Sequence, residues 1–187
     1  MTKLIFVTHP SVIVDPNKHP DEWQLSDEGL KEVERLLQKE FWREIKKIYS
    51  STALKAFSVA KLAAQKYNIN IQKVNELNEI NRDSTGFLSQ EKYNSAIEDF
   101  YIHPSDSYKG WETAYEATER IKKCIDDIFA DQPDELIVIV GHGIIGSCLS
   151  CFIKGIDPAF NEDNDISSSL IEIHWRNKKI INDWQRY

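Results

Sequence analysis

Apolar and polar residues follow one another along the chain in a pattern typical of strands that alternate with helices. The segments 3–7, 45–50, 70–74 and 136–140 are rich in β-branched, aliphatic or aromatic residues, and each predicts a strand. The segment 136–140 is the most apolar of them, and we expect it to be a central strand that is buried on both faces.

Helical spacing of apolar residues lies between these segments. Leu30, Val33, Leu37 and Phe41 recur at intervals of three or four residues, and Ser26 precedes them as a candidate N-cap. The same reasoning predicts helices at 53–67, 113–129 and 144–153. The region 76–110 has no clean period and is expected to form loops and short helices.

The order of these elements predicts an α/β fold with a mostly parallel central sheet and helices on both faces. The segments 170–175 and 179–184 are predicted to close the chain as an antiparallel hairpin. Because no internal repeat or long linker divides the sequence, we expect one domain over residues 1–187. Within it, we expect residues 76–112 to form a cap over the functional site, whose candidate residues are given below.

Composition and charge narrow the class of ligand. The chain has 187 residues, of which 41% are hydrophobic and 28% charged, and its formal net charge is −7. Such an acidic chain is a poor general binder of nucleic acid or of an anionic membrane. An anionic ligand would therefore need a local cluster of cations.

The three cysteines, Cys124, Cys148 and Cys151, cannot form a disulfide framework and suit a reducing compartment. The first apolar run is too short for a signal peptide or a membrane span, so we expect a soluble cytoplasmic protein. No HExxH motif or paired Cys/His spacing predicts a metal site. Cys148 and Cys151 form a CxxC inside an apolar helix, which favours packing over redox chemistry.

Two histidines occupy matching places at predicted strand ends. His9 comes two residues after the segment 3–7, and His142 comes two residues after the segment 136–140. In open α/β sheets, ligands bind beyond the carboxyl ends of the strands. We therefore expect the two imidazoles to face each other across one pocket, and we expect the other three histidines to lie at the surface: His19, His103 and His174.

The segment Gly141–Gly146 also matches the GxGxxG pattern of dinucleotide-binding proteins. The remainder of that module is missing, since no further parallel strand ending in an acidic residue follows. Glycines at a helix N-terminus nevertheless allow a phosphate to approach the backbone.

Six motifs in order resemble those of the histidine phosphatase (phosphoglycerate mutase-like) superfamily. They are Thr8-His9-Pro10 in the place of Arg-His-Gly, Leu25-Ser26-Asp27-Glu28-Gly29, the stretch 51–60, Leu77-Asn78-Glu79 followed by Gly86, Gly110-Trp111-Glu112-Thr113, and Val140-Gly141-His142-Gly143. The resemblance covers nearly the whole chain and implies the fold of that superfamily.

The resemblance also implies a mechanism without metal or cofactor. His9 would attack phosphorus and form a phosphohistidine, with a backbone carbonyl fixing its tautomer. Glu79 would protonate the leaving oxygen and then deprotonate water. His142 would donate a hydrogen bond to a phosphoryl oxygen. The residues expected to bind the substrate are Thr8, Lys55, Arg82 and Gly143.

This chain departs from the family pattern at positions where family members have positively charged residues, and at one glycine. Family members have arginine where this chain has Thr8 and Lys55, and glycine where it has Pro10. Lysine keeps the charge but loses the bidentate geometry. Arg82 is the candidate to compensate, although it could equally be a surface residue paired with Asp83, and Lys55 could equally be an exposed helix lysine.

These observations favour a metal-independent phosphomonoesterase acting on a small phosphorylated metabolite. The shorter chain favours hydrolysis over the mutase activity of longer family members. The alternative is a weakened family member that binds a phosphorylated ligand or a protein partner without efficient turnover. A dinucleotide-binding protein is a third, more distant reading, and nothing in the sequence indicates an oligomeric state.

Overall fold

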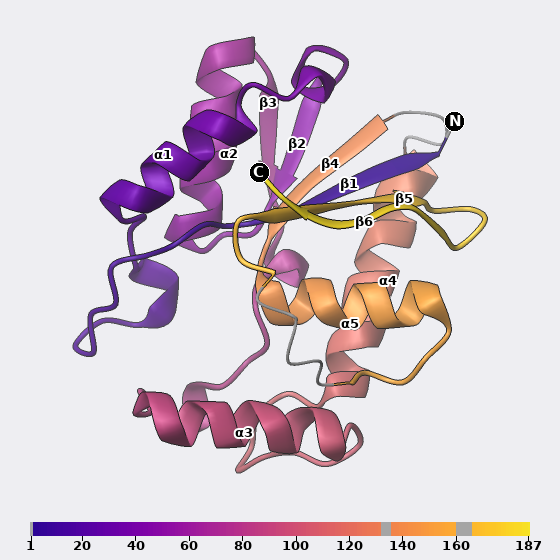
Figure 1. The fold of residues 1–187 in the computed structure, drawn as a ribbon. Helices are drawn as coiled ribbons and strands as arrows, with labels where there is room; N and C mark the ends of the chain where they lie inside the picture. The colour runs from indigo at the N-terminus through magenta and orange to yellow at the C-terminus, as the bar shows by residue number, and fades with distance from the viewer. Residues whose placement is uncertain (1, 132–135, 160–165) are drawn as a thin grey trace.

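The computed structural model describes residues 2–131, 136–159 and 166–187 of the chain (Figure 1). Its sheet has six strands in the order β3-β2-β4-β1-β5-β6. The strands are β1 (Lys3–Thr8), β2 (Lys47–Ser50), β3 (Asn70–Lys73), β4 (Leu136–Gly141), β5 (Ser169–His174) and β6 (Lys179–Arg186). The helices are α1 (Asp27–Leu36), α2 (Leu54–Tyr67), α3 (Gln90–Ile102), α4 (Ala114–Asp131) and α5 (Gly143–Lys154).

The sheet confirms the predicted fold class. The strands β3, β2, β4 and β1 run parallel, whereas β5 pairs antiparallel with β1 and β6 pairs antiparallel with β5. The two central strands, β1 and β4, are far apart in sequence and are direct neighbours in the sheet. Ligands of open α/β sheets bind where the strand order reverses, and here that point lies between β1 and β4.

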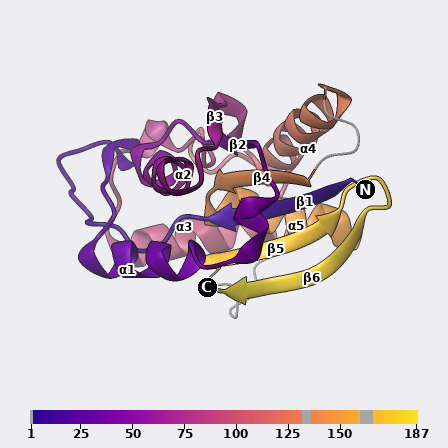
Figure 2. The same cartoon turned by 90° about the horizontal axis from the view of Figure 1, so that it is seen from above.

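Helices cover both faces of the sheet (Figures 1 and 2). Side chains that alternate along β1 and β4 point to opposite faces, because the side-chain period of a strand is two. Ile5 and Val138 pack with α1 and α2, whereas Phe6 and Ile139 pack with α4 and α5. Helix α3 lies beyond α5, at the far end of the molecule from β3 in Figure 1.

Two helical predictions need correction. The amphipathic helix after Ser26 ends at Leu36, and Phe41 belongs to a separate 3-10 turn over Glu40–Arg43. The indole N–H of the fully buried Trp42 donates to the Leu36 carbonyl at 2.9 Å, so this carbonyl at the end of α1 is bonded to a side chain instead of to a further helical turn. The region without a clean period contains α3, which has 13 residues and is longer than the short helices expected.

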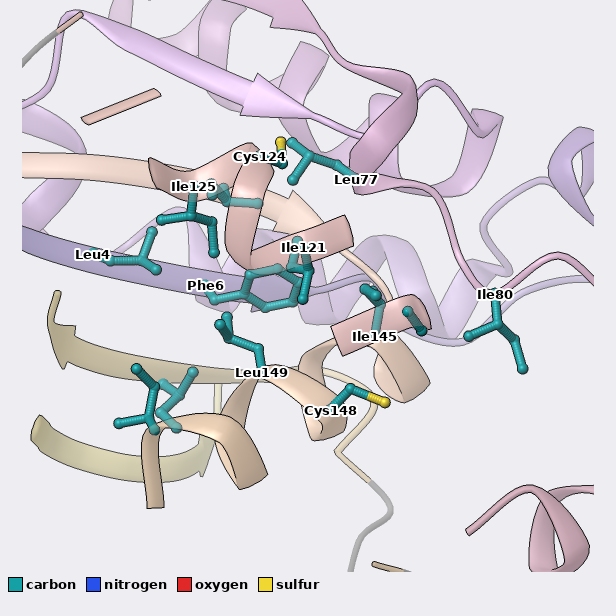
Figure 3. Packing of buried hydrophobic residues seen from close by; sticks show 14 of the residues in the cluster. Leu4, Phe6, Leu77, Ile80, Ile121, Cys124, Ile125, Ile145, Cys148 and Leu149 are labelled. Carbon is teal, nitrogen blue, oxygen red and sulfur yellow. The ribbon is translucent and has the colours of Figure 1, made fainter. Parts of the chain in front are cut away.

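The glycines near the end of β4 are required by the core. Phe6 is fully buried among side chains of α4 and α5, including Ile121 and Leu149 (Figure 3). A Cβ atom on Gly141 would lie 2.6 Å from Cζ of Phe6, and one on Gly146 would lie 3.0 Å from Cε1 of the same ring. These contacts account for two of the glycines in the GxGxxG pattern by packing alone.

Among the described residues, no helix combines the length and the apolar composition needed to cross a bilayer.

The contact between Gly141 and Phe6 gives a stability prediction. Gly141→Ala should lower the free energy of unfolding by about 1–3 kcal/mol, because overpacking forces the ring or the strand to move. The measurement is urea unfolding followed by circular dichroism. Gly143→Ala is the matched control, since its Cβ would have only an ordinary contact, 3.8 Å from Cγ1 of Ile166. Equal stability of the two variants would contradict the prediction.

Candidate active site

The two histidines lie side by side because the strands that precede them are paired. Thr8 at the end of β1 is in register with Gly141 at the end of β4. The backbone N–H of His9 continues this ladder and donates to the Gly141 carbonyl at 3.1 Å. The ring centroids of His9 and His142 are 5.1 Å apart, with an angle of 75° between the ring planes. The structure therefore brings together two imidazoles from opposite ends of the chain.

The His9 ring is held in one tautomer. Its Nδ1 lies 2.8 Å from the Pro10 carbonyl, and a carbonyl can only accept, so Nδ1 carries the proton. The pKa of His9 is lowered from 6.5 to about 4, first by burial and then by the charge of Lys55, against a smaller raising effect of the Pro10 hydrogen bond. At neutral pH the Nε2 atom therefore holds an unprotonated lone pair, as a nucleophile needs.

His142 is completely buried, and among the described residues one of its two ring nitrogens has a hydrogen-bond partner. Its Nε2 lies 2.7 Å from the hydroxyl of Ser51. Its Nδ1 is buried and has no hydrogen-bond partner among the described residues. Burial is the main cause that places the pKa of His142 well below 6.5, followed by the positive charges that His9 and Lys55 can carry.

Ser51 and Asn78 lie in two of the sequence motifs, but the sequence analysis gave neither of them a role in the site. Ser51 is fully buried and directly follows β2, the parallel neighbour of β4 on the side away from β1. Its hydroxyl donates to the side-chain oxygen of Asn78 at 2.7 Å. The same oxygen accepts the backbone N–H of Thr52 at 2.8 Å. A polar residue immediately after a third parallel strand was the available signal for Ser51, since that position matches those of the two histidines.

Glu79 contacts the first turn of α5. Its Oε2 accepts the backbone N–H of Ile144 at 3.0 Å, and its Oε1 accepts that of Ile145 at 2.9 Å. A carboxylate is favourable there because the first N–H groups of a helix have no partner within the helix and carry a partial positive charge. This contact places Glu79 at the start of α5, the helix whose N-cap residue is His142.

The segment that carries Glu79 is clamped by an ion pair. Arg120 of α4 binds Glu112 through two hydrogen bonds of 2.7 and 2.8 Å. Its guanidinium also donates to the backbone carbonyls of Glu76 and Asn78, at 2.5 and 3.1 Å. Glu112 in turn accepts the backbone N–H of Asn81 at 3.1 Å. Arg120 and Glu112 thus hold the backbone on both sides of Glu79.

Lys55 is a buried cation of α2 and not an exposed helix lysine. Only 4% of the residue is exposed, and its ammonium donates to the Pro20 carbonyl at 2.9 Å. Burial lowers the pKa of Lys55 to about 8, although the carboxylates of Glu79 and Asp21 act in the opposite direction.

Arg82 is oriented by an aromatic ring and not by its neighbour Asp83. Its guanidinium carbon lies 4.7 Å from the centre of the Tyr93 ring. Asp83 instead lies 2.9 Å from Nε2 of His19. Arg82 is close enough to Lys55 and His142 to lower the pKa of both groups.

Thr8 lies next to His9, but its hydroxyl faces the other neighbouring strand. It accepts the backbone N–H of Ser169 at 3.1 Å and also contacts the carbonyl of Ile166. These partners belong to β5 and the segment just before it. The hydroxyl of Thr8 is therefore engaged by the backbone at the position where family members have arginine.

A cavity of about 650 Å³ adjoins the site. Lys55, Glu79 and Arg82 contribute to one part of its wall. The remaining wall comes from residues 14–23 and 78–93, together with Trp111. Its aromatic residues include Trp23 and Phe87, whose ring centroids are 6.4 Å apart.

Within the described part of the chain, no group of three or more His, Cys, Asp or Glu side chains is arranged to hold a metal ion.

Comparison with known proteins places this geometry in a family. Residues 17–183 match the model of the histidine phosphatase superfamily (branch 1). The chain is 26% identical over 196 aligned positions to phosphoserine phosphatase 1 of Hydrogenobacter thermophilus, and the alignment covers 97% of this chain and 91% of that protein.

Solved structures have the same fold. The YhfR protein of Bacillus stearothermophilus matches with a TM-score of 0.84 and 18% identity, over 98% of this chain and 96% of that one. The phosphoserine phosphatase of Entamoeba histolytica, solved with 3-phosphoglyceric acid, matches with a TM-score of 0.78 and 16% identity, over 100% of this chain and 98% of that one. A mycobacterial glucosyl-3-phosphoglycerate phosphatase, solved with inorganic phosphate, matches with a TM-score of 0.76 and 17% identity, over 99% of this chain and 95% of that one.

The environment of His9 gives a prediction about its titration. In the ligand-free protein the pKa of His9 should be about 4, because the ring is partly buried, loses hydration and lies near Lys55. Lys55→Met should raise that pKa toward its ordinary value without reaching it, because burial, the larger cause, remains. Nuclear magnetic resonance of the histidine ring protons measures it. Lys61→Met, an exposed change on the same helix, is the control and should leave the pKa of His9 unaltered.

Proposed function

Because the chain belongs to the histidine phosphatase superfamily, we propose that it is a metal-independent phosphatase that hydrolyses the monoester of a small phosphorylated metabolite through a phosphohistidine on His9. The observation that carries this proposal is the pair of imidazoles 5.1 Å apart, one of which has an unprotonated Nε2. The phosphatases among its relatives support the same class of reaction.

The reaction would proceed in two displacements at phosphorus. In the first, Nε2 of His9 forms a bond to phosphorus while the ester P–O bond breaks, and its electron pair leaves with the alcohol oxygen. In the second, water attacks phosphorus, the N–P bond breaks, and its electron pair returns to Nε2. Phosphoryl transfer needs mainly an in-line arrangement and positive charge around the equatorial oxygens, which side chains can supply.

Glu79 is the proposed proton carrier. It would protonate the leaving oxygen in the first displacement and take a proton from water in the second. Among the described residues, Oε2 accepts one backbone N–H, that of Ile144, which leaves a second lone pair for the transferred proton. The clamp formed by Arg120 and Glu112 would keep this carboxyl group in place through both steps.

The charge of the phosphoryl group would be balanced by cations from two separate segments. Lys55 comes from α2 and Arg82 from the segment 76–112, which we propose as the cap over the site. The start of α5 at Gly143 would contribute the positive end of a helix. We propose no direct contact for the Thr8 hydroxyl, because backbone groups near β5 already bind it. Thr8 would instead position His9 by continuing the β1 strand.

The adjoining cavity would receive the leaving group. Its volume of about 650 Å³ exceeds what a bare phosphoryl group needs, and its walls combine aromatic rings with paired charges.

We expect the protein to act in a reducing compartment, the cytoplasm, since Cys124, Cys148 and Cys151 are all free and buried.

A second candidate function follows from the scarcity of cations next to His9. Thr8 and Lys55 stand where family members have two arginines, so a protein that binds phosphate without turnover is the alternative. The loss of one oxyanion contact can lower a rate by about 10²–10³. Tight binding of phosphate without any phosphoryl adduct would favour this alternative.

The nucleophile prediction separates the two functions. Wild-type protein should release phosphate from an aryl phosphate in the presence of a chelator and should form an acid-labile phosphoryl adduct on mixing. His9→Ala should lose the adduct and lower kcat by at least about 10³-fold, because the attacking atom is gone. His103→Ala, a change at an exposed histidine, is the control and should keep full activity. Equal activity of His9→Ala and wild type would contradict the proposal.

The cavity gives a separate prediction about the leaving group. Phe87 is 47% exposed although it lines the cavity, so a bulky leaving group should cover it. Phe87→Ala should lower kcat/KM for 2-naphthylmethyl phosphate by about fivefold to thirtyfold, the effect of losing about 1–2 kcal/mol of apolar contact. It should change kcat/KM for ethyl phosphate by less than about twofold. Ile102→Ala, an exposed change in α3, is the control, and an equal loss for both esters would contradict the assignment.

A further inference from the structure

The hydrogen bonds behind His142 determine which of its nitrogens carries a proton. The side chain of Asn78 has a fixed orientation, because its oxygen accepts the Thr52 backbone N–H at 2.8 Å. Its Nδ2 donates to the Thr52 hydroxyl, also at 2.8 Å. A flipped amide would place a donor against the backbone N–H. The oxygen of Asn78 is therefore the atom that faces Ser51.

Ser51 has a single hydroxyl proton, which it donates in a hydrogen bond to Asn78. The Asn78 oxygen lies 2.7 Å from Oγ of Ser51, and a carbonyl oxygen cannot donate, so the proton lies between these two atoms. The same Oγ accepts the backbone N–H of Ala53 at 3.1 Å. Toward Nε2 of His142, 2.7 Å away, Ser51 can then only accept. Nε2 of His142 therefore carries the proton.

A neutral His142 with its proton on Nε2 has a bare lone pair on Nδ1. This atom is buried and has no partner among the described residues. An unpartnered buried polar atom is costly, and a catalytic role is one of the reasons for which proteins retain one. The oxygens of a phosphate dianion offer only lone pairs, so they cannot bond to this nitrogen unless a proton lies between them.

We propose that the site binds its phosphate ester together with one proton, which is shared between Nδ1 of His142 and a phosphoryl oxygen. The ester enters as the monoanion, or as the dianion with uptake of a proton from solvent. This inference rests on the proposed phosphatase function and specifies the form of the substrate that the site accepts. Ser51 and Asn78 are positioning residues in it, because they act through the tautomer of His142.

The surrounding charges explain why the proton would arrive with the anion and not before. The charged and titratable groups that face this part of the site are His9, Lys55, Glu79, Arg82 and Arg120. Three of them are cations, and the buried imidazole is far from water, so an imidazolium in the empty site is unfavourable. A bound phosphate anion places negative charge beside the imidazole and makes its protonation favourable.

The test uses His9→Ala, which cannot turn over the ester and in which His9 cannot take the proton. Calorimetry of 4-nitrophenyl phosphate binding in two buffers of different ionisation heat counts the protons taken up. At about pH 7 the ester is mainly the dianion and Lys55 is mainly charged, so uptake of about one proton is expected. Affinity should fall by about tenfold for each pH unit above the second pKa of the ester.

Asn78→Ala, made in the same His9→Ala protein, separates this role from a merely structural one. Without Asn78 as acceptor, the Ser51 hydroxyl can donate to Nε2, and His142 can then donate from Nδ1 to a dianion. Proton uptake should fall from about one to near zero, and affinity should become nearly independent of pH. Asn75→Ala, an exposed amide in the same segment, is the matched control and should keep the uptake.

Each outcome separates the inference from the proposed function. Binding of the ester without proton uptake in His9→Ala would overturn the inference and leave the phosphatase proposal intact. Failure of wild-type protein and His9→Ala to bind any phosphate ester would contradict both. A measurement that does not depend on the Asn78 variant is the nitrogen resonance pattern of His142 in the ligand-free wild type. It should report a protonated Nε2, and a protonated Nδ1 would overturn the inference.

Discussion

The pairing of β1 with β4 is the constraint on which the site depends. It brings His9 and His142, which are far apart in sequence, to the same edge of the sheet within one ladder step. Small residues make this pairing possible at the point of chemistry, because a side chain on Gly141 would collide with the Phe6 ring. The neighbouring strand β2 then adds Ser51 behind His142. Three parallel strands thus deliver three polar side chains to one point.

The electrostatic design of the site follows from burial. Both imidazoles are kept neutral because desolvation and nearby cations disfavour a further positive charge. A neutral His9 is what nucleophilic attack needs, whereas a neutral His142 with its proton on Nε2 has nothing to donate from Nδ1. In the proposed mechanism, the same low-dielectric surroundings therefore favour His9 as the nucleophile and leave His142 dependent on a proton that comes with the substrate.

Much of the fold was predictable because the chain uses the period of each element consistently. The apolar runs located the strands, and the rule that ligands bind at strand ends located both histidines. The tautomer of His142 was not predictable, since it depends on Asn78, which lies 27 residues after Ser51 and meets it only in the folded chain. The length of α3 was underestimated because its buried positions form a short stripe in a largely polar segment, namely Ala96, Ile97, Phe100 and Tyr101.

In the proposed mechanism, cations from other segments take the place of an arginine beside His9. An arginine in the place of Thr8 would have to displace hydrogen bonds that join β1 to the start of β5. Arg82 approaches instead from the loop before α3, where the ring of Tyr93 supports its guanidinium and the Arg120–Glu112 pair holds the backbone just before it. One of the two proposed cations, Arg82, is then tied to the position of that loop, whereas Lys55 is carried by α2. In the proposed mechanism, the position of the cap and the contribution of Arg82 to the charge balance at phosphorus therefore depend on the same few contacts.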